Sequence, residues 1–250
     1  MLKVLSSCTL QMKVSVVTPT YNRRPFINAL ITIYNNQTYP KDLMEWIILD
    51  DGQDKVGDLF LASGIPNLRY IPLEDKLRIG AKRNRLNAEA TGQIIIAMDD
   101  DDYYPPERVQ IVVTAFQQNP RIDLAGSSQM YLYYLDTHKV YTIGPYMPNH
   151  ATNGTMAWRK RYAEKHQYDE FVTKGEETSF LQDYTYPMIQ LDPLQTILVI
   201  CHTDNTVDKT KLRQQAEQKP TKDKMRETKY KLQDIVKDKA LINFYTTYMS

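Results

Sequence analysis

The chain is poor in cysteine. Cys8 and Cys201 are the only two, and they form no CxxC spacing. This excludes a disulfide framework and fits a reducing compartment. Long apolar runs are also missing, since no stretch reaches the roughly 18 apolar residues of a transmembrane helix. The first eleven residues are too short and too polar for a secretory signal peptide. We therefore expect a soluble, cytoplasmic protein.

A strong charge of one sign is absent as well. The net charge of +1 gives no general case for nucleic acid or a membrane as partner. Residues 1–207 hold 20 Lys/Arg and 24 Asp/Glu, whereas residues 208–250 hold 11 and 6. We interpret this basic tail as a solvated helical face. Peripheral contact with an anionic membrane surface, or with a protein partner, is the alternative.

What the chain does contain is an alternation of strand-like and helix-like segments. A length of 250 residues with 42% hydrophobic content suits one globular domain. Strands are predicted at 13–19, 44–49, 68–71 and 94–98, and helices at 23–37, 80–90 and 107–118. This order predicts an α/β fold with a mainly parallel sheet.

The periodicity weakens after about residue 121. Further strands are expected at 124–127, 130–135, 139–143, 153–159 and 197–201. The segment from 208 to 241 is charged, helix-prone and broken by Pro220. We expect it to form one or two exposed helices that pack on the body.

The most informative stretch joins an apolar run to four carboxylates. Residues 94–98 (IIIAM) lead into Asp99, Asp100, Asp101 and Asp102, and Pro105 and Pro106 follow closely. In an extended segment, Asp99 and Asp101 would point one way and the other two the opposite way. Paired carboxylates at a strand end suit Mg²⁺ or Mn²⁺. A solvated acidic turn is the competing interpretation.

Three predicted strands end in polar residues that belong together. The strands at 13–19, 44–49 and 94–98 end in Thr18-Pro19, in Asp50-Asp51 and in the four aspartates. Ligands of parallel α/β sheets bind outside the carboxyl ends of the strands. We therefore expect a site at this edge.

Four segments, in this order and spacing, resemble the family 2 glycosyltransferases. They are 15–23 (SVVTPTYNR), 48–52 (ILDDG), 78–84 (RIGAKRN) and 98–102 (MDDDD) with Pro105. The resemblance covers about residues 13–205 and implies a GT-A fold, which is Rossmann-like with a mainly parallel central sheet. It implies a glycosyltransferase domain over 12–207, with a nucleotide-binding half at 12–105 and an acceptor-binding half at 106–207. Residues 208–250 form a charged helical extension.

The resemblance also implies a reaction. A sugar would pass with inversion from a nucleotide-diphosphate donor, preferably a UDP-sugar, to a hydroxyl of a glycan or other acceptor. Asp99-x-Asp101 matches the family's DxD signature, with Asp101 as direct ligand of Mn²⁺ or Mg²⁺ and Asp99 nearer the ribose or a metal-bound water. Such an ion stabilises the charge of a departing diphosphate.

Matching positions suggest further donor contacts. Asp50 and Asp51 match the acidic pair that contacts the nucleoside, although turn or helix-cap aspartates would read the same way. Tyr21 would stack on the base or pack in the core. Arg83, together with Arg78 and Lys82, would offset diphosphate charge, or the latter two would lie on a solvated helix face. The full donor set is Pro19, Tyr21, Arg23, Asp50, Asp51, Arg78, Arg83, Asp99 and Asp100.

The acceptor hydroxyl must lose its proton as the new bond forms, which calls for a base. Residues 171–180 resemble the family's Gly-Glu-Asp segment, with Glu177 in place of the last acid. Because glutamate is one methylene longer, Glu176 is the alternative base, and an exposed acidic loop is the other interpretation. His202 follows the last predicted strand and would complete the metal shell or merely form a hydrogen bond.

The acceptor pocket is the least defined part. Asn153-Gly154 and Trp158 would line it, or would form a β-turn and a core residue. Five tyrosines would stack on sugar rings or simply pack: Tyr131, Tyr133, Tyr134, Tyr141 and Tyr146.

Two other kinds of protein compete with a glycosyltransferase. One is another enzyme, either a nucleotidyltransferase or an aspartyl phosphatase, and the other is a non-catalytic binding module. A nucleotidyltransferase would need a glycine-rich loop after the first strand, and residues 18–22 contain no glycine. An aspartyl phosphatase would need its nucleophile where this chain has threonine and proline. A non-catalytic sugar- or cation-binding module predicts metal binding without turnover.

Overall fold

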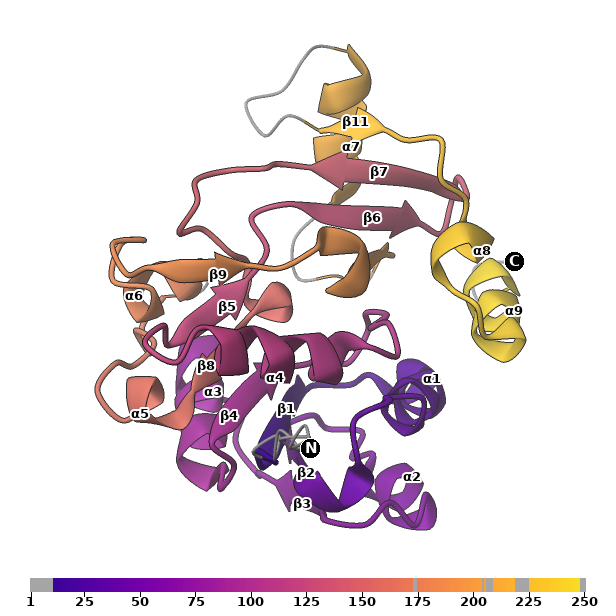
Figure 1. The fold of residues 1–250 in the computed structure, drawn as a ribbon. Helices are drawn as coiled ribbons and strands as arrows, with labels where there is room; N and C mark the ends of the chain where they lie inside the picture. The colour runs from indigo at the N-terminus through magenta and orange to yellow at the C-terminus, as the bar shows by residue number, and fades with distance from the viewer. Residues whose placement is uncertain (1–10, 173–174, 204, 206–208, 219–224, 248–250) are drawn as a thin grey trace, which may run out of the picture.

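The computed structural model describes residues 11–172, 175–203, 205, 209–218 and 225–247 (Figure 1). Its centre is a seven-stranded sheet in the order β3-β2-β1-β4-β8-β5-β9. The parallel part consists of β1 Val14–Thr20, β2 Met44–Asp50, β3 Leu68–Pro72 and β4 Ile94–Ala97. The remainder consists of β8 Ala157–Arg159, antiparallel to β4, then β5 Leu124–Gly126 and β9 Met188–Gln190. The predicted α/β fold with a mainly parallel sheet is confirmed.

Both faces of the parallel strands are apolar, as expected of a sheet that is covered on both sides. Val16 and Ile96 belong to one buried cluster, whereas their chain neighbours Val17 and Ile95 belong to another. The first cluster includes residues of α1 Arg24–Asn35, α2 Gly57–Ala62 and α4 Arg108–Gln118. The second includes residues of α3 Ile79–Glu89. The three predicted helices are therefore confirmed as elements that cover the sheet.

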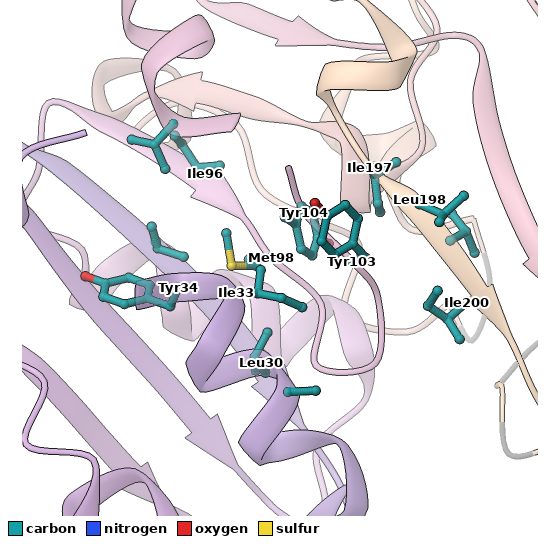
Figure 2. Packing of buried hydrophobic residues seen from close by; sticks show 14 of the residues in the cluster. Leu30, Ile33, Tyr34, Ile96, Met98, Tyr103, Tyr104, Ile197, Leu198 and Ile200 are labelled. Atoms are coloured by element: carbon teal, nitrogen blue, oxygen red, sulfur yellow. The ribbon is translucent and has the colours of Figure 1, made fainter. Parts of the chain in front are cut away.

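A second sheet lies above the first and shares its core. Its strands, in the order β10-β6-β7-β11, are β10 Leu198–Cys201, β6 Met130–Tyr134, β7 Lys139–Ile143 and β11 Arg226–Glu227. Figure 2 shows Ile33 of α1 and Met98 in the same buried cluster as Tyr103 and Leu198 of β10. This continuous cluster lies beneath the acidic turn and joins it to β10.

The tail contains more than the expected helices. Among its described residues it forms α7 Lys209–Gln218, β11, α8 Leu232–Ile235 and α9 Lys239–Thr247. The tail packs on the body as expected, since α9 lies beside α1 and buries Leu241 and Tyr245. The expectation of one or two helices was wrong, because the described residues of the tail form three helices, and β11, which pairs with β7, was not expected. Pro220, the predicted break, lies outside the described residues.

Several short elements were not predicted, since they are too short to show a period. They are α2, β9, β11, α5 Lys160–Ala163, α6 Glu177–Phe180, and the 3-10 helices η1 Lys41–Leu43, η2 Asn153–Thr155 and η3 Pro193–Gln195. None of the helices within the described ranges is long and apolar enough to cross a bilayer.

Pro19 does not end the first strand, contrary to the prediction. β1 continues to Thr20, whereas β4 ends at Ala97, opposite Val17. Val17 accepts its hydrogen bond from Met98 on the β4 side, so Pro19, two residues on, faces the same side beyond the end of β4. None of the described strands pairs with β1 at Pro19 on that side. The lack of an N–H on proline therefore costs no hydrogen bond between strands.

Candidate functional site

The parallel strands bring their carboxyl ends to one edge of the sheet. Thr20 of β1 lies opposite Asp50 of β2, and β4 on the other side ends three residues short of this level, at Ala97 opposite Val17. The predicted convergence of the three strand ends is thus confirmed. The residues that follow each strand form the walls of the candidate site.

The acidic residues follow β4 in a bend rather than as an extended strand. The amide of Met98 still donates to Val17 (3.1 Å), but β4 has ended at Ala97 and the chain bends at residues 100–102. The expected strict alternation of the four carboxylates was therefore wrong. Each of them instead has its own set of partners.

Asp101 lies at the centre of the bend. Its Oδ2 accepts from Arg23 Nε (3.3 Å) and lies 3.1 Å from His202 Nε2 and 3.4 Å from Asn205 Nδ2. The imidazole of His202 packs against the ring of Phe26 at 4.6 Å. Burial opposes the charge of Asp101, but the His202 hydrogen bond and nearby cations outweigh it and lower the pKa of this carboxyl.

Asp100 and Asp102 flank this charge and are themselves buried. Burial first, and then the charge of Asp101, raise the pKa of both carboxyls. Asp102 Oδ1 accepts from the amide of Ile200 (2.8 Å), and Tyr103 exchanges two backbone hydrogen bonds with Leu198 (3.0 and 2.9 Å). Contacts with β10 therefore hold the bend in place, and Asp101 is the one of these three carboxyls whose pKa is lowered.

Asp99 faces the opposite side, toward the acceptor half. Its carboxylate lies 3.4 Å from Arg83 Nη1, and Arg83 Nε donates to Glu176 Oε1 (2.9 Å). Burial lowers the pKa of Arg83, but the charges of Asp99 and Glu176 outweigh this and hold it above its ordinary value. Gly154 adjoins Asp99 so closely that a Cβ there would meet Asp99 Oδ2 at 2.9 Å. Arg83 is thus a bridge between the acidic bend and the predicted base segment.

The two glutamates of that segment differ in their surroundings. Glu176 is paired with Arg83, whereas no side chain among the described residues forms an ion pair with Glu177. Burial, and then the charge of Glu176, raise the pKa of Glu177. Residues 173–174 of the segment lie outside the described part of the chain. Arg83 thus pairs with Glu176 and not with Glu177.

At the carboxyl end of β2, Asp51 is buried and paired. Its carboxylate accepts from Lys82 Nζ and from the amide of Leu77 (2.8 Å). Lys82, expected as a diphosphate contact or on a solvated face, is buried against Asp51. Tyr21 is half-buried at the rim, with Lys76 Nζ 3.7 Å from its ring centre.

The carboxylate of Asp50 is bound by the turn that follows β2. Its carboxylate accepts from the amides of Gly52 (2.8 Å) and Val56 (3.0 Å) and from the hydroxyl of Tyr70 (2.6 Å), and the residue is fully buried. These bonds hold the turn after β2. The expected nucleoside contact of Asp50 is therefore corrected to the turn-aspartate alternative.

Other predicted residues are placed at the rim or in the core. Arg78 is exposed at the start of α3 and donates to the carbonyl of Phe171 (2.8 Å). Trp158 is buried and donates to Asn87 (3.1 Å), so it is a core residue and not a pocket wall. The packing interpretation holds for the buried tyrosines Tyr133, Tyr134 and Tyr141, whereas Tyr131 and Tyr146 are half-buried.

Two residues of the site were missed. Asn205 holds both Asp101 and the amide of His202 (2.9 Å), and the Tyr104 hydroxyl accepts from the amide of Asp99 (2.7 Å). Nothing in the sequence distinguishes this asparagine or this tyrosine from the others. Their roles depend on contacts made only in the folded chain.

The donor set fits a divalent cation whose shell is completed by a ligand. Within the described ranges, no three His, Cys, Asp or Glu side chains are grouped to hold a metal by themselves. Asp101 Oδ2 and His202 Nε2 are 3.1 Å apart. Neighbouring ligands at 2.0–2.1 Å in an octahedral shell are separated by about 3 Å, and Mg²⁺ commonly takes one or two carboxylates plus phosphates and water. The residues therefore fit two adjacent positions of such a shell.

Comparison with known sequences points to one family. The model described as glycosyl transferase family 2 matches residues 15–171. The uncharacterized glycosyltransferase YwdF of Bacillus subtilis is 26% identical over 177 residues, which are 64% of this chain and 63% of that protein. An uncharacterized glycosyltransferase of Methanocaldococcus jannaschii is 26% identical over 71% of this chain and 68% of its own length. The chain thus spans less than two thirds of the Bacillus relative.

Solved structures share the fold. S. aureus TarS 1–349, in complex with UDP-GlcNAc, matches with a TM-score of 0.64 and 19% identity over 78% of this chain and 60% of that one. The mannosyltransferase PcManGT from Pyrobaculum calidifontis, in complex with GDP-Man and Mn²⁺, matches with a TM-score of 0.61 and 15% identity over 78% of this chain and 58% of that one. These similarities confirm the expected GT-A fold.

Proposed function

Because the chain belongs to glycosyl transferase family 2, we propose that it is a metal-dependent, inverting enzyme that moves a sugar from a nucleotide-diphosphate donor to a hydroxyl of a glycan or other acceptor. The observation that carries the proposal is the acidic edge of the sheet. There Asp101 adjoins His202 at 3.1 Å, while Arg83 links Asp99 to Glu176. The groups that would bind the cation and the diphosphate thus lie at the same edge of the sheet as the glutamates that would act as base.

Asp101 and His202 would hold Mn²⁺ or Mg²⁺, and Asp99, which faces Arg83, would lie nearer the ribose or a metal-bound water. When bound, the cation would offset the negative charge that develops on the departing nucleoside diphosphate. Arg23 and Arg83 flank the acidic bend on its two sides and would attract the diphosphate. Asp100 and Asp102 are buried beside Asp101 and would hold it in place.

The nucleoside would lie over the ends of β1 and β2. Pro19 lies in β1 one residue before its end, Tyr21 follows β1 and Asp51 follows β2, so these residues would form the wall that the nucleobase meets. Arg78 lies at the rim of the same region. We propose UDP as the nucleotide; TarS was solved with UDP-GlcNAc and PcManGT with GDP-Man, so GDP is the alternative to test. This assigns the donor to residues 12–105 and the acceptor to residues 106–207.

Glu177 would act as base in a single displacement. The acceptor oxygen attacks the anomeric carbon, the bond from that carbon to the diphosphate oxygen breaks, and the hydroxyl proton passes to Glu177. The raised pKa of Glu177 suits proton acceptance better than that of an ordinary surface carboxylate. Glu176 keeps Arg83 in position.

Ligand-induced stabilisation tests the proposal. Thermal unfolding is measured with UDP, GDP, CMP and dTDP, each with and without Mn²⁺. A ligand at a hundred times its Kd stabilises by about 2.7 kcal/mol, which raises Tm by about 5–10 °C for a chain of this size. We expect one nucleoside diphosphate to do so only with Mn²⁺. Its sugar nucleotides are then screened for release of the diphosphate.

Lack of response to all four nucleotides would contradict the proposal. Binding without diphosphate release from any sugar nucleotide would instead favour a non-catalytic module.

A further inference from the structure

Helix α3 carries two adjacent polar residues that contact different parts of the site. Arg83 joins Asp99 to Glu176, as described above. Asn84 instead contacts the segment 168–171, which precedes the two glutamates along the chain. A helix of the nucleotide-binding half thus holds a segment of the acceptor-binding half.

Both the nitrogen and the oxygen of the Asn84 side-chain amide form hydrogen bonds in this contact. Its Nδ2 donates to the carbonyl of Tyr168 and to Glu170 Oε1, both at 2.9 Å, and its Oδ1 accepts from the amide of Tyr168 at 2.9 Å. A side chain in this place needs both a donor and an acceptor. Among similar side chains, aspartate would lack the donor and leucine would lack both.

A second contact on the same face of α3 acts on the same segment. Gly80 lies four residues before Asn84, which places the two on one face of the helix. A Cβ on Gly80 would meet the carbonyl oxygen of Asp169 at 2.2 Å. The absence of a side chain at Gly80 therefore lets the segment approach the helix backbone.

The segment is in turn tied to the glutamates. The amide of Asp169 donates to Ser179 Oγ (2.8 Å), and Ser179 Oγ donates to the carbonyl of Glu176 (2.8 Å). At its other end, the Tyr168 hydroxyl donates to Asn153 Oδ1 (2.6 Å), next to Gly154 and hence to Asp99. A displacement of residues 168–171 would therefore move Glu176 and Glu177 relative to Asp99.

We propose that Asn84 is a positioning residue for sugar transfer. It fixes the segment 168–171 on α3 and so holds Glu176 and Glu177 at the acceptor side of Asp99. The inference rests on the proposed function, but it concerns a residue that contacts neither donor nor base. Misplacing a reacting group by about 1 Å can cost about a hundredfold in rate.

The test compares three single variants on this helix. Asn84→Ala removes the side-chain amide that binds the segment 168–171. Gly80→Ala adds a methyl group that would displace the same segment from the helix backbone. Arg85→Ala is the matched control, because Arg85 is exposed and pairs only with Glu89 in the described residues. The assay is hydrolysis of the sugar nucleotide that the donor screen identifies, with water as acceptor, alongside the affinity for the corresponding nucleoside diphosphate with Mn²⁺.

We expect Asn84→Ala and Gly80→Ala to slow hydrolysis by about a hundredfold, with diphosphate affinity unchanged. Hydrogen exchange at the amides of Tyr168 and Asp169 should accelerate in Asn84→Ala. Arg85→Ala should match the parent in all three measurements. Gly80→Ala is informative because alanine is the better helix former, so a loss of rate there cannot come from a weakened helix.

Parent-like hydrolysis in both variants would overturn the inference and leave the proposed function intact. The inference would also be overturned if the variants lost diphosphate affinity by the same factor as they lost rate, because that result indicates a general structural role. If the parent cleaves no sugar nucleotide, the proposed function fails instead. Unchanged hydrogen exchange at Tyr168 in Asn84→Ala would then overturn the inference by itself.

Discussion

Asp101 is the residue on which the donor side of the site depends. Burial opposes the charge of Asp101, but His202 and nearby cations outweigh it and lower the pKa of this carboxyl, whereas burial and then the charge of Asp101 raise the pKa of Asp100 and Asp102. A hard cation prefers a charged oxygen ligand. Of the four aspartates, Asp101 therefore makes the strongest case as the metal ligand.

Replacing Asp101 should abolish metal-dependent donor binding. In Asp101→Ala, the Tm increase caused by the nucleoside diphosphate should be the same with and without Mn²⁺, since one of the two adjacent ligands is gone. Asp75→Ala, at an exposed position, serves as the control and should retain the full Mn²⁺-dependent increase. A normal Mn²⁺ response in Asp101→Ala would place the cation elsewhere.

Glu177 should affect chemistry and not binding. Glu177→Gln keeps the size of the side chain but cannot accept the proton, so the transfer rate should fall by about 10²–10⁴-fold. Nucleoside diphosphate affinity should remain that of the parent. The exposed Glu164→Gln is the control. If Glu177→Gln transfers at the parent rate, Glu177 is not the base.

The same residue predicts a pH dependence. A base acts only when deprotonated, so the rate should rise as pH increases through the pKa of Glu177. Burial and the charge of Glu176 raise that pKa, so the midpoint of the rise should lie above the ordinary glutamate value of about 4.3. The pH profile of turnover measures this midpoint. In Glu177→Gln, the rise in rate with increasing pH should be absent.

At this scale, the sequence predicted the site through order and spacing, but not the partner of each side chain. Asp50 and Asp51 follow the same strand and could not be told apart. Only the folded turn shows that the backbone amides of Gly52 and Val56 donate hydrogen bonds to the carboxylate of Asp50. His202 was predicted beside Asp101, whereas Asn205 carried no signal, since an asparagine after a strand is ordinary.

At the scale of elements, Arg213 ties α7 to the second sheet. Arg213 donates from Nη1 and Nη2 to the two carboxylate oxygens of Asp136 (2.6 and 2.7 Å), and its guanidinium lies 4.6 Å from the ring centre of Tyr134. The Tyr134 hydroxyl also donates to the carbonyl of Lys209 (2.8 Å). These contacts explain why a charged segment packs against the body.

Arg213→Met should loosen this attachment. Asp136 is 46% exposed, so solvent screens the ion pair, and the loss of unfolding free energy should be about 1 kcal/mol. Chemical denaturation measures it, with Gln214→Met at an exposed position of the same helix as control. No difference between the two variants would mean that the pair contributes nothing.

The pH dependence of that loss has a defined sign. The hydrogen bond from Arg213 lowers the pKa of Asp136, so the pair stabilises the folded state above the unfolded aspartate pKa of about 3.9. The stabilisation should disappear as pH falls through the lower folded value. The gap between parent and Arg213→Met should therefore be constant from pH 7 to pH 5 and should narrow below pH of about 4.

Elements with a clear period were predictable, and those defined by a partner were not. The apolar strands β1, β2 and β4 and the amphipathic helix α1 carry their burial pattern in the sequence. β11 has two residues and β9 has three, so each is a strand only because β7 or β5 lies beside it. No local pattern specifies such a pairing.

For the whole molecule, the main structural fact is that both sheets share one core. Tyr103 and Leu198 join the acidic turn to β10 through two backbone hydrogen bonds, and their side chains belong to the cluster that includes α1 and β4 (Figure 2). No local pattern in the sequence indicated this pairing, because Tyr103 and Leu198 are distant along the chain. Since the turn carries Asp101, the geometry of the site depends on that shared core.

This arrangement predicts that the two sheets unfold together. Leu198 is fully buried, and Leu198→Ala should cost about 2–5 kcal/mol through lost contacts and a cavity. Far-UV circular dichroism reports both sheets, whereas Trp46 and Trp158 lie in the first sheet only, so fluorescence reports that sheet. Both signals should shift to the same lower midpoint. Leu61→Ala, whose parent side chain is 70% exposed, should change stability by less than about 0.5 kcal/mol. If Leu198→Ala instead separates the two signals, the sheets have independent cores, and the acidic turn owes its position to the first sheet alone.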